Sequence, residues 1–167
     1  SVSVAQHLIA PLLHRFQRGH PDASIQIRTT IWPDDFASTT ADIEIRFGPR
    51  NMVGKDAKLL QPSQLHAVAT PKLCETIDTT NPIQSLTTQK LIQPIGISTS
   101  WKSYAPLNNR EADVFVDNHG LAVDLAIGGA GIALTHSLIT GPALKDGRLA
   151  LLPLPPVNAE EGYYLHQ

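Results

Sequence analysis

The chain has 167 residues, of which 42% are hydrophobic and 17% are charged, a composition typical of a globular protein. A formal net charge of -2 gives it no electrostatic reason to bind nucleic acid itself, because phosphate binding depends on clustered Lys and Arg. The single Cys74 excludes an internal disulfide, and no Cys/His spacing matches a zinc site. We therefore expect no metal, no other cofactor and a reducing cytoplasm.

The N-terminal part predicts one long helix. Between residues 5 and 18 the apolar side chains recur at helical spacing, which predicts one buried stripe. Pro11 should kink this helix, because proline lacks an N–H and crowds the preceding turn. Ser3 fits the first position of a capping box, and Gly19 gives a stop signal at the other end.

Alternating apolar and polar residues predict extended segments after this helix. The pattern indicates strands at 24–31 and 41–48 and a third extended piece at 59–68, with a short helical or turn segment starting at 33–36. In the second strand, ADIEIRFG, charged and apolar side chains occupy opposite faces and the run stops at a glycine. We expect this strand to deliver its last side chains to a functional surface.

From residue 71 onward, helices alternate with strands. The expected helices cover 71–77, 81–91, 101–107, 119–129 and 138–144, and the expected strands cover 91–97, 113–118, 132–136 and 148–152. This alternation implies parallel sheets with right-handed crossovers. The charge-free stretch 125–144 is as long as a membrane-spanning helix. We do not expect it to span a membrane, because its glycines and its polar and proline residues lower its hydrophobicity.

Six stretches resemble, in order and spacing, the effector-binding domain of LysR-type transcriptional regulators: HLIAPLLHRFQRGHPDASIQI, ADIEIRFG, LHAVATPKL, VDNHGLAVDLAIGGAGIALTHSLI, LKDGRLALL and YYLH. The most specific marks are D-I-x-I-R-x-G at 42–48 and G-x-G-I-A-L at 129–134. A helix with a central proline that ends in F-x-x-x-H-P, at residues 8–21, resembles the branch containing the glycine-cleavage activator and the β-lactamase regulator.

The resemblance implies an α/β fold of the two-lobed type II periplasmic-binding-protein kind. It would have two crossover segments and mostly parallel sheets with helices on both faces. Residues 1–70 would form the first part of lobe I, 71–152 would form lobe II, and 153–167 would return to lobe I. The family also implies an N-terminal winged helix-turn-helix domain, which is absent from this chain and through which alone DNA would be bound.

The same resemblance implies partners. Effector domains of the family pair as homodimers, the full-length protein is expected to be a homotetramer, and no membrane is involved. The helix at 5–18 and the strand at 24–30 would form the dimer surface. A small-molecule effector would bind in the cleft between the lobes.

Ligands of open parallel sheets lie beyond the carboxyl ends of the strands, which places the expected site at strand ends and helix starts. The predicted ligand-binding residues are Ser3, Thr29, Thr30, Arg46, Phe47, Thr99, Ser100, Trp101, Asp117, Asn118 and His136. Three of them have an alternative structural role. Ser3 can be an ordinary cap, Arg46 can pair with Asp42 or Glu44, and Trp101 can belong to the core.

The two helix starts at Ser3 and Asn118 favour a ligand with a carboxylate or another compact acceptor, because helix N-termini expose N–H groups and a positive dipole end. The charge of Asp117 favours an amine nearby. An amino-acid-like molecule would satisfy both. The glycines at 128–131 follow a helix and do not open one, so they do not form a phosphate loop.

Catalysis is disfavoured, since no G-x-S-x-G, H-E-x-x-H or paired-cysteine motif occurs. The sequence therefore predicts the effector-sensing domain of a bacterial regulator, in which nothing is chemically transformed. The alternative is a periplasmic solute-binding receptor of a transporter, which would share the fold and the cleft.

Overall fold

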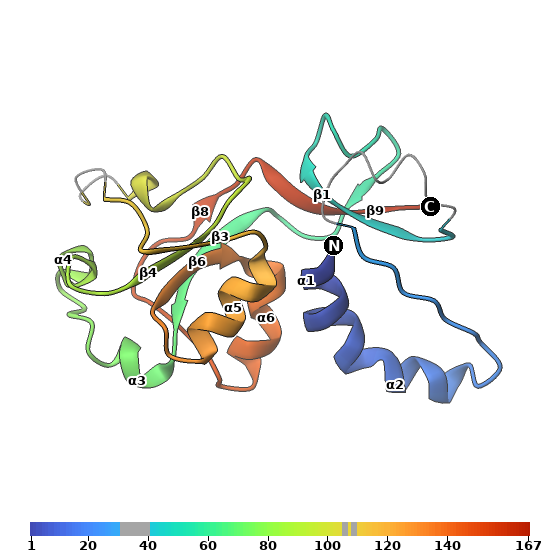
Figure 1. Ribbon diagram of the computed structural model, residues 1–167, viewed down its shortest axis with the longest axis horizontal. Coiled ribbons are helices and arrows are strands. Elements are labelled where there is room, and N and C mark those ends of the chain that lie inside the picture. Colours follow the sequence, from blue (N-terminus) through green and yellow to red (C-terminus); the bar gives the residue numbers. More distant parts are fainter. Residues whose placement is uncertain (31–40, 105–106, 108–109) are drawn as a thin grey trace.

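The computed structural model describes residues 1–30, 41–104, 107 and 110–167. Two sheets organise these residues (Figure 1). The smaller sheet has the order β1-β9-β2, from Glu44–Pro49, Glu161–His166 and Lys58–Leu59. The larger sheet has the order β5-β4-β6-β3-β7, from Val114–Val116, Leu91–Pro94, Ile132–His136, Gln64–Ala69 and Ala150–Leu151, and β8 (Val157–Asn158) also pairs with β3.

Strand pairing is mixed among the described strands. β4 runs parallel to β5 and β6, whereas β3 runs antiparallel to β6, β7 and β8, and β9 runs antiparallel to β1 and β2. The α/β fold with two sheets is confirmed, but the prediction of mostly parallel sheets is wrong for this part of the chain. The described antiparallel pairs all involve β3 or β9, the two strands that the chain enters when it crosses from one sheet to the other.

Both faces of the larger sheet are covered. On one face α5 (His119–Ile127) and α6 (Ser137–Lys145) pack against the sheet, with Val123 and Ile139 in the buried core (Figure 1). The other face is covered by a 3₁₀ turn (Trp101–Ser103), α3 (Pro71–Cys74) and α4 (Pro82–Leu86), with Trp101 and Leu86 fully buried. Burial on both sides explains why these strands read as nearly continuous apolar runs.

The helix predicted at 5–18 is formed by α1 (Val2–Val4), the π-helical turn η1 (Ala5–Ile9) and α2 (Ala10–Gly19). In the π-helical turn the Ala10 N–H donates to the Ala5 carbonyl. This wider turn lies directly before Pro11, which has no N–H to donate, so the irregularity expected at the proline is placed in the preceding turn. The predicted stop at Gly19 is confirmed.

The buried stripe predicted for this helix is wrong over its second half. Val4 is 2% exposed and Leu8 packs on the core, but Leu12 and Phe16 are 54% and 48% exposed. No residue of α2 is buried. α2 extends away from the two sheets (Figure 1), so its apolar side chains find no cover among the described residues.

Residues 24–30 run extended but pair with no described strand, so the strand predicted at 24–31 is wrong here. A groove of about 430 Å³ is lined by residues of this segment, by residues 41–45 and by Ser1, Val4, Ala5 and Ile9. The helical or turn segment predicted at 33–36 lies outside the described residues.

Other expected elements differ mainly in their ends. The extended piece predicted at 59–68 divides into the end of β2 and most of β3, which belong to different sheets. The helices predicted at 71–77 and 81–91 are single short turns, capped by the Thr70 and Asn81 side chains. The strand predicted at 132–136 is confirmed as β6. Among the described residues no helix is both long and apolar enough to cross a membrane.

The chain crosses between the sheets twice, after β2 and after β8, and the two connections run side by side. The Ala159 N–H donates to the Ser63 carbonyl at 2.9 Å, and the Leu60 N–H donates to the Tyr163 carbonyl at 2.9 Å. Gly162 lies so close to Ser63 that a Cβ there would overlap its Oγ. By sheet membership β3 and β8 belong with the larger sheet, and the lobe boundaries at 70/71 and 152/153 remain predictions.

Candidate functional site

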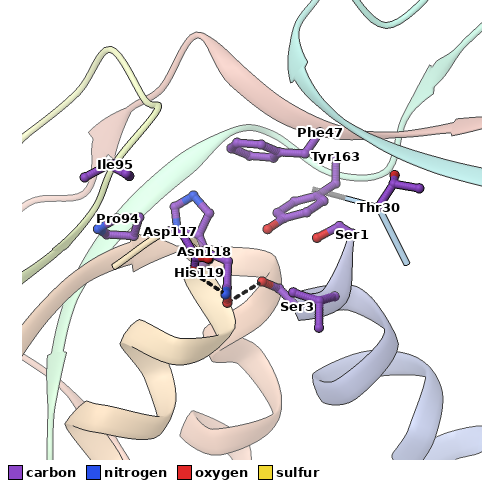
Figure 2. Close-up of a pocket in the computed structure, with 11 residues that line it drawn as sticks. Ser1, Ser3, Thr30, Phe47, Pro94, Ile95, Asp117, Asn118, His119 and Tyr163 are labelled. Atoms are coloured by element: carbon purple, nitrogen blue, oxygen red, sulfur yellow. Dashed lines mark hydrogen bonds between the residues drawn. The ribbon is translucent and has the colours of Figure 1, made fainter. Parts of the chain in front are cut away.

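A small pocket lies between the two sheets, beside the starts of α1 and α5 (Figure 2). Phe47 and Tyr163 face it from the smaller sheet, and Ser3, Asn118 and His119 face it from the helix starts (Figure 2). Its cavity volume is about 80 Å³. The full lining consists of Ser1, Val2, Ser3, Thr30, Phe47, Pro94, Ile95, Asp117, Asn118, His119 and Tyr163.

The Ser3 side chain joins α1 to α5 at this pocket. Its Oγ accepts the Gly120 N–H at 2.9 Å and donates to Asn118 Oδ1 at 3.2 Å. Ser3 is fully buried and lies inside α1, while Ser1 is the N-cap residue and makes no side-chain capping bond. The predicted capping box is therefore wrong, and the hydroxyl bonds to another helix.

Two of the first amides of α5 already have partners. Asn118 is its N-cap, and Oδ1 of this residue accepts the Leu121 N–H at 2.8 Å as the sequence predicts. The Gly120 amide donates to Ser3, as described above. Asp117 is exposed at the pocket mouth, where its Oδ1 accepts from the Asn118 side-chain amide at 2.8 Å. The N–H groups that were expected to be unpaired at this helix start are thus partly hydrogen-bonded to the protein's own side-chain oxygens.

His119 supplies a buried imidazole to the pocket wall and is 3% exposed. The His136 backbone N–H donates to its Nδ1 at 3.1 Å, and Thr135 Oγ1 lies 2.9 Å from the same nitrogen. Burial, with the neighbouring His136 charge as the smaller cause, lowers the pKa of His119 to about 3. The ring is therefore neutral at physiological pH.

Aromatic rings enclose this imidazole. The Phe47 ring centroid lies 5.2 Å from that of His119 and 4.7 Å from that of Tyr163. Burial raises the pKa of Tyr163, and hydrogen bonds with Ser3 and Ser1 act in the opposite direction. The Tyr163 phenol therefore stays protonated and offers a neutral O–H beside the two serines.

The sequence model of the LysR substrate binding domain matches residues 1–166, nearly the whole chain. The chain belongs to the LysR substrate-binding-domain family. A comparison with curated proteins finds no match. Membership confirms the resemblance to effector domains of LysR-type regulators, and the periplasmic receptor alternative finds no support in these comparisons.

Solved structures share the fold of this LysR domain. The effector domain of the transcriptional regulator AmpR of Pseudomonas aeruginosa is 19% identical, with a TM-score of 0.72 over 98% of this chain and 80% of that chain. The CrgA regulatory domain from Neisseria meningitidis is 15% identical, with a TM-score of 0.71 over 99% and 84%. Full-length AphB of Vibrio cholerae is 16% identical, with a TM-score of 0.63 over 97% and 57%. The predicted type II periplasmic-binding-protein-like fold is confirmed.

The LysR domain brings part of the predicted site together. The predicted residues that line the pocket are Ser3, Thr30, Phe47, Asp117 and Asn118. The predicted residues outside its lining are Thr29, Arg46, Thr99, Ser100, Trp101 and His136. Effector contact by any of them stays a prediction, and their protein partners indicate which have a structural role.

Arg46 and Trp101 have the partners expected of structural residues. Arg46 Nη2 lies 2.7 Å from Glu44 Oε2, and Nη1 donates to the Val53 carbonyl at 3.0 Å. Trp101 is 0% exposed, and its Nε1–H donates to the Ile92 carbonyl at 3.0 Å. These contacts favour the ion-pair interpretation of Arg46 and the core interpretation of Trp101.

The remaining polar side chains also bond within the LysR domain. Thr99 Oγ1 donates to the Asn158 carbonyl at 3.4 Å, and Ser100 Oγ accepts the Lys102 N–H at 3.2 Å. His136 is fully buried, and its Nδ1 accepts the Leu138 N–H at 3.1 Å. Burial lowers the pKa of His136 to about 4, and the nearby His66 is a smaller cause.

Sequence reasoning missed His119 and Tyr163 as pocket residues. His119 directly follows the predicted Asn118, so its place in the first turn of a helix facing the cleft was an available signal. Tyr163 lies in the YYLH stretch, but no periodicity tells which of its two tyrosines faces inward. Among the described residues no group of three or more His, Cys, Asp and Glu side chains could hold a metal ion.

Proposed function

We propose that this LysR domain senses a small polar effector in the pocket between its two lobes. The observation that carries the proposal is the junction of Ser3, Asn118 and Gly120, which joins the starts of α1 and α5 at the pocket between the two sheets. A ligand placed there would contact Phe47 and Tyr163 of the smaller sheet and the start of α5 at once. Its chemistry would be carboxylate-like or amino-acid-like, because a helix N-terminus and the exposed Asp117 line the same space.

In the proposed mechanism the effector is bound and released unchanged, in the cytoplasm and without a cofactor. An effector that binds one relative orientation of the lobes more tightly shifts the population toward it. A separate winged helix-turn-helix domain would bind DNA, and the lobe orientation would set the geometry of the DNA-bound homotetramer. The F-x-x-x-H-P ending of the first helix supports a place in the branch of the glycine-cleavage activator and the β-lactamase regulator.

We test the effector site by a thermal-shift screen of small acids, amino acids and aromatics, followed by calorimetry on each hit. A ligand specific for the native state raises the melting temperature by mass action. Ser3→Ala should weaken binding of a true hit about tenfold, because loss of its bonds to Gly120 and Asn118 releases the start of α5 from α1 at the pocket. Thr76→Val is the matched control, because this exposed hydroxyl donates to the Leu73 carbonyl away from the pocket lining, whereas Thr99→Val tests the predicted contact of Thr99. A hit indifferent to Ser3→Ala and Asp117→Asn would contradict the site.

We propose that a second copy of the chain covers the exposed apolar side chains of the N-terminal region. Leu12 and Phe16 on α2 are joined by Ile25 and Ile27, which are 41% and 44% exposed. These segments lie on the side of the molecule away from the larger sheet (Figure 1). The family resemblance, which pairs this helix and the following extended segment between two copies, supports the choice of partner.

Leu12→Asp should convert the dimer to a monomer in sedimentation velocity, because a desolvated unpaired carboxylate opposes association. His14→Asp is the matched control, since it adds the same charge two residues along the helix on another face. An unaltered dimer in Leu12→Asp, or equal dissociation in both variants, would contradict this surface.

A further inference from the structure

The tautomer of His119 is fixed by the backbone of β6. Its Nδ1 accepts the His136 N–H at 3.1 Å, so this nitrogen carries no proton. A neutral imidazole has one N–H, and it must therefore be at Nε2. The bond to His136 also sets the direction of the ring, because Nδ1 must point at β6 and Nε2 away from it.

The Nε2–H of His119 is buried and has no hydrogen-bond partner among the described residues. An unsatisfied buried donor costs about 1–3 kcal/mol, so native proteins rarely retain one without a reason. The ring lines the pocket and rises from the start of α5 toward Phe47 and Tyr163 (Figure 2). Its Nε2 lies just beneath the pocket surface, so an effector oxygen would reach it once the ring of Phe47 or Tyr163 shifts. Three other buried histidine nitrogens of the described residues, on His7, His66 and His136, also lack a hydrogen-bond partner, but none of these residues lines this pocket.

The pocket also restricts which other donors an effector can reach. The amides of Gly120 and Leu121 already donate to Ser3 and Asn118. The positive end of the nine-residue helix α5 remains beside the cavity and favours a negative group. His119 thus adds a neutral, fixed donor at a helix start where the Gly120 and Leu121 amides already have partners.

We propose that His119 Nε2–H donates a hydrogen bond to a carboxylate oxygen of the effector, with an amine of the same molecule beside Asp117. This inference rests on the proposed function, because it assumes that the pocket is the effector site. The cavity of about 80 Å³ is well below the roughly 300 Å³ of a pocket that encloses a whole drug-sized ligand. Only the compact polar end of the effector is enclosed, with the carboxylate inside and the amine at the exposed mouth.

Two substitutions separate the donor from the structural acceptor. His119→Asn keeps an acceptor near the position of Nδ1 and removes the Nε2 donor, whereas His119→Gln keeps a donor near Nε2 and loses the acceptor for His136. The probes are alanine, propionate, alaninamide and 2-aminopropane. They carry both charges, the carboxylate alone, the amine with a neutral amide, and the amine alone.

We expect alanine to bind most tightly in calorimetry and His119→Asn to weaken it about tenfold or more, as for a hydrogen bond to a charged group. His119→Gln should retain most of the affinity and lose more thermal stability than His119→Asn. Equal affinity in wild type and His119→Asn, or equal loss in both variants, overturns the proposal. If only alaninamide or 2-aminopropane binds, and Ser3→Ala weakens it, the effector site stands and the role of His119 falls. Failure of every carboxylate to bind overturns the ligand class.

A measurement on the unaltered protein covers the case in which a variant does not fold. In nitrogen-15 NMR the His119 Nε2–H tautomer should be present without ligand, and its proton should move downfield when alanine binds. A signal that is unchanged at saturation, or a protonated Nδ1, overturns the proposal.

Discussion

His119 and His136 are two titratable side chains held neutral inside the molecule. Their pKa values fall to about 3 and about 4, mainly because burial penalises the charged form. The groups that face them are each other, His66 and Tyr163, together with the Thr135 hydroxyl. None of these is an acid that could stabilise a positive charge on either ring.

Stability should therefore fall as the solution is acidified. An unfolded histidine takes up a proton near its ordinary pKa of 6.5. In the native state His136 takes one up only near pH 4 and His119 only near pH 3. Below pH 6.5 the unfolded state thus binds more protons than the native state. Each histidine then lowers the free energy of unfolding by up to about 1.4 kcal/mol per pH unit. Urea unfolding across this pH range measures the slope.

His136→Asn removes one of these titrations and should flatten the slope, to which His66 also contributes because burial lowers its pKa, while the Asn oxygen can still accept the Leu138 N–H. His14→Asn is the matched control, because His14 is exposed on α2. If the slope is the same in wild type and His136→Asn, the acid sensitivity has another source.

Some site residues could be predicted from the sequence because local rules determine them. Asn118 was predicted because a side-chain oxygen before a helix caps it in most contexts. Ser3 was predicted as a site residue, but its role was wrong, because its partner Gly120 lies far away in the sequence and only packing of α1 on α5 brings them together. The donor of His119 could not be predicted, since its tautomer depends on a bond to β6.

At the scale of the element, the helix-to-strand return after α5 depends on glycine. Gly129 has a φ of 79° and Gly131 a φ of 154°, both unfavourable for other residues. A Cβ on Gly131 would also overlap the backbone carbonyl of Lys90, which leads into β4. The close approach keeps β6 in register with β4, and the Ile132 N–H donates to the same carbonyl at 2.9 Å.

Gly131→Ala should lower the free energy of unfolding by about 2 kcal/mol or more, because backbone strain and a backbone clash act together. Chemical denaturation measures this directly. Gly19→Ala is the matched control, since no other group lies within 4 Å of a Cβ there and alanine favours a helix. A cost below 1 kcal/mol in Gly131→Ala, on the scale of ordinary substitutions, would contradict the clash.

Elements with two covered faces were predicted well, and elements whose partners lie elsewhere were not. The strand at 132–136 has an apolar pattern set by the core on each side, so its ends match β6. The alternation at 24–31 is equally clear, yet a pattern specifies only the faces of a strand, and pairing needs a neighbour at hydrogen-bonding distance. ADIEIRFG forms β1 only from Glu44 onward, where β9 supplies that neighbour, and residues 41–43 lie outside the strand.

At the scale of the whole molecule, the first connection between the sheets contacts the start of β9, where Ser63 meets Gly162. A methyl group on Gly162 would overlap Ser63 Oγ and lie 2.9 Å from Leu59 Cδ1. Gly162→Ala should therefore lower the free energy of unfolding by about 1–3 kcal/mol, the usual cost of overpacking.

Adding Ser63→Ala removes the overlapping oxygen and should restore a large part of this loss, which a double-mutant cycle measures by urea unfolding. The backbone bond from Ala159 to the Ser63 carbonyl is kept in both variants. Additive losses in the double variant would show that Ser63 and Gly162 are not in contact in solution.

The contact between the two connections limits how the lobes can move. Two connections in contact with each other would act as one hinge. Such a hinge can bend, but it resists sliding or twisting of one lobe past the other. Opening and closing would then be a swing with one degree of freedom. A small rotation at the pocket would then displace the far ends of both lobes by an amount that grows with their distance from the hinge axis.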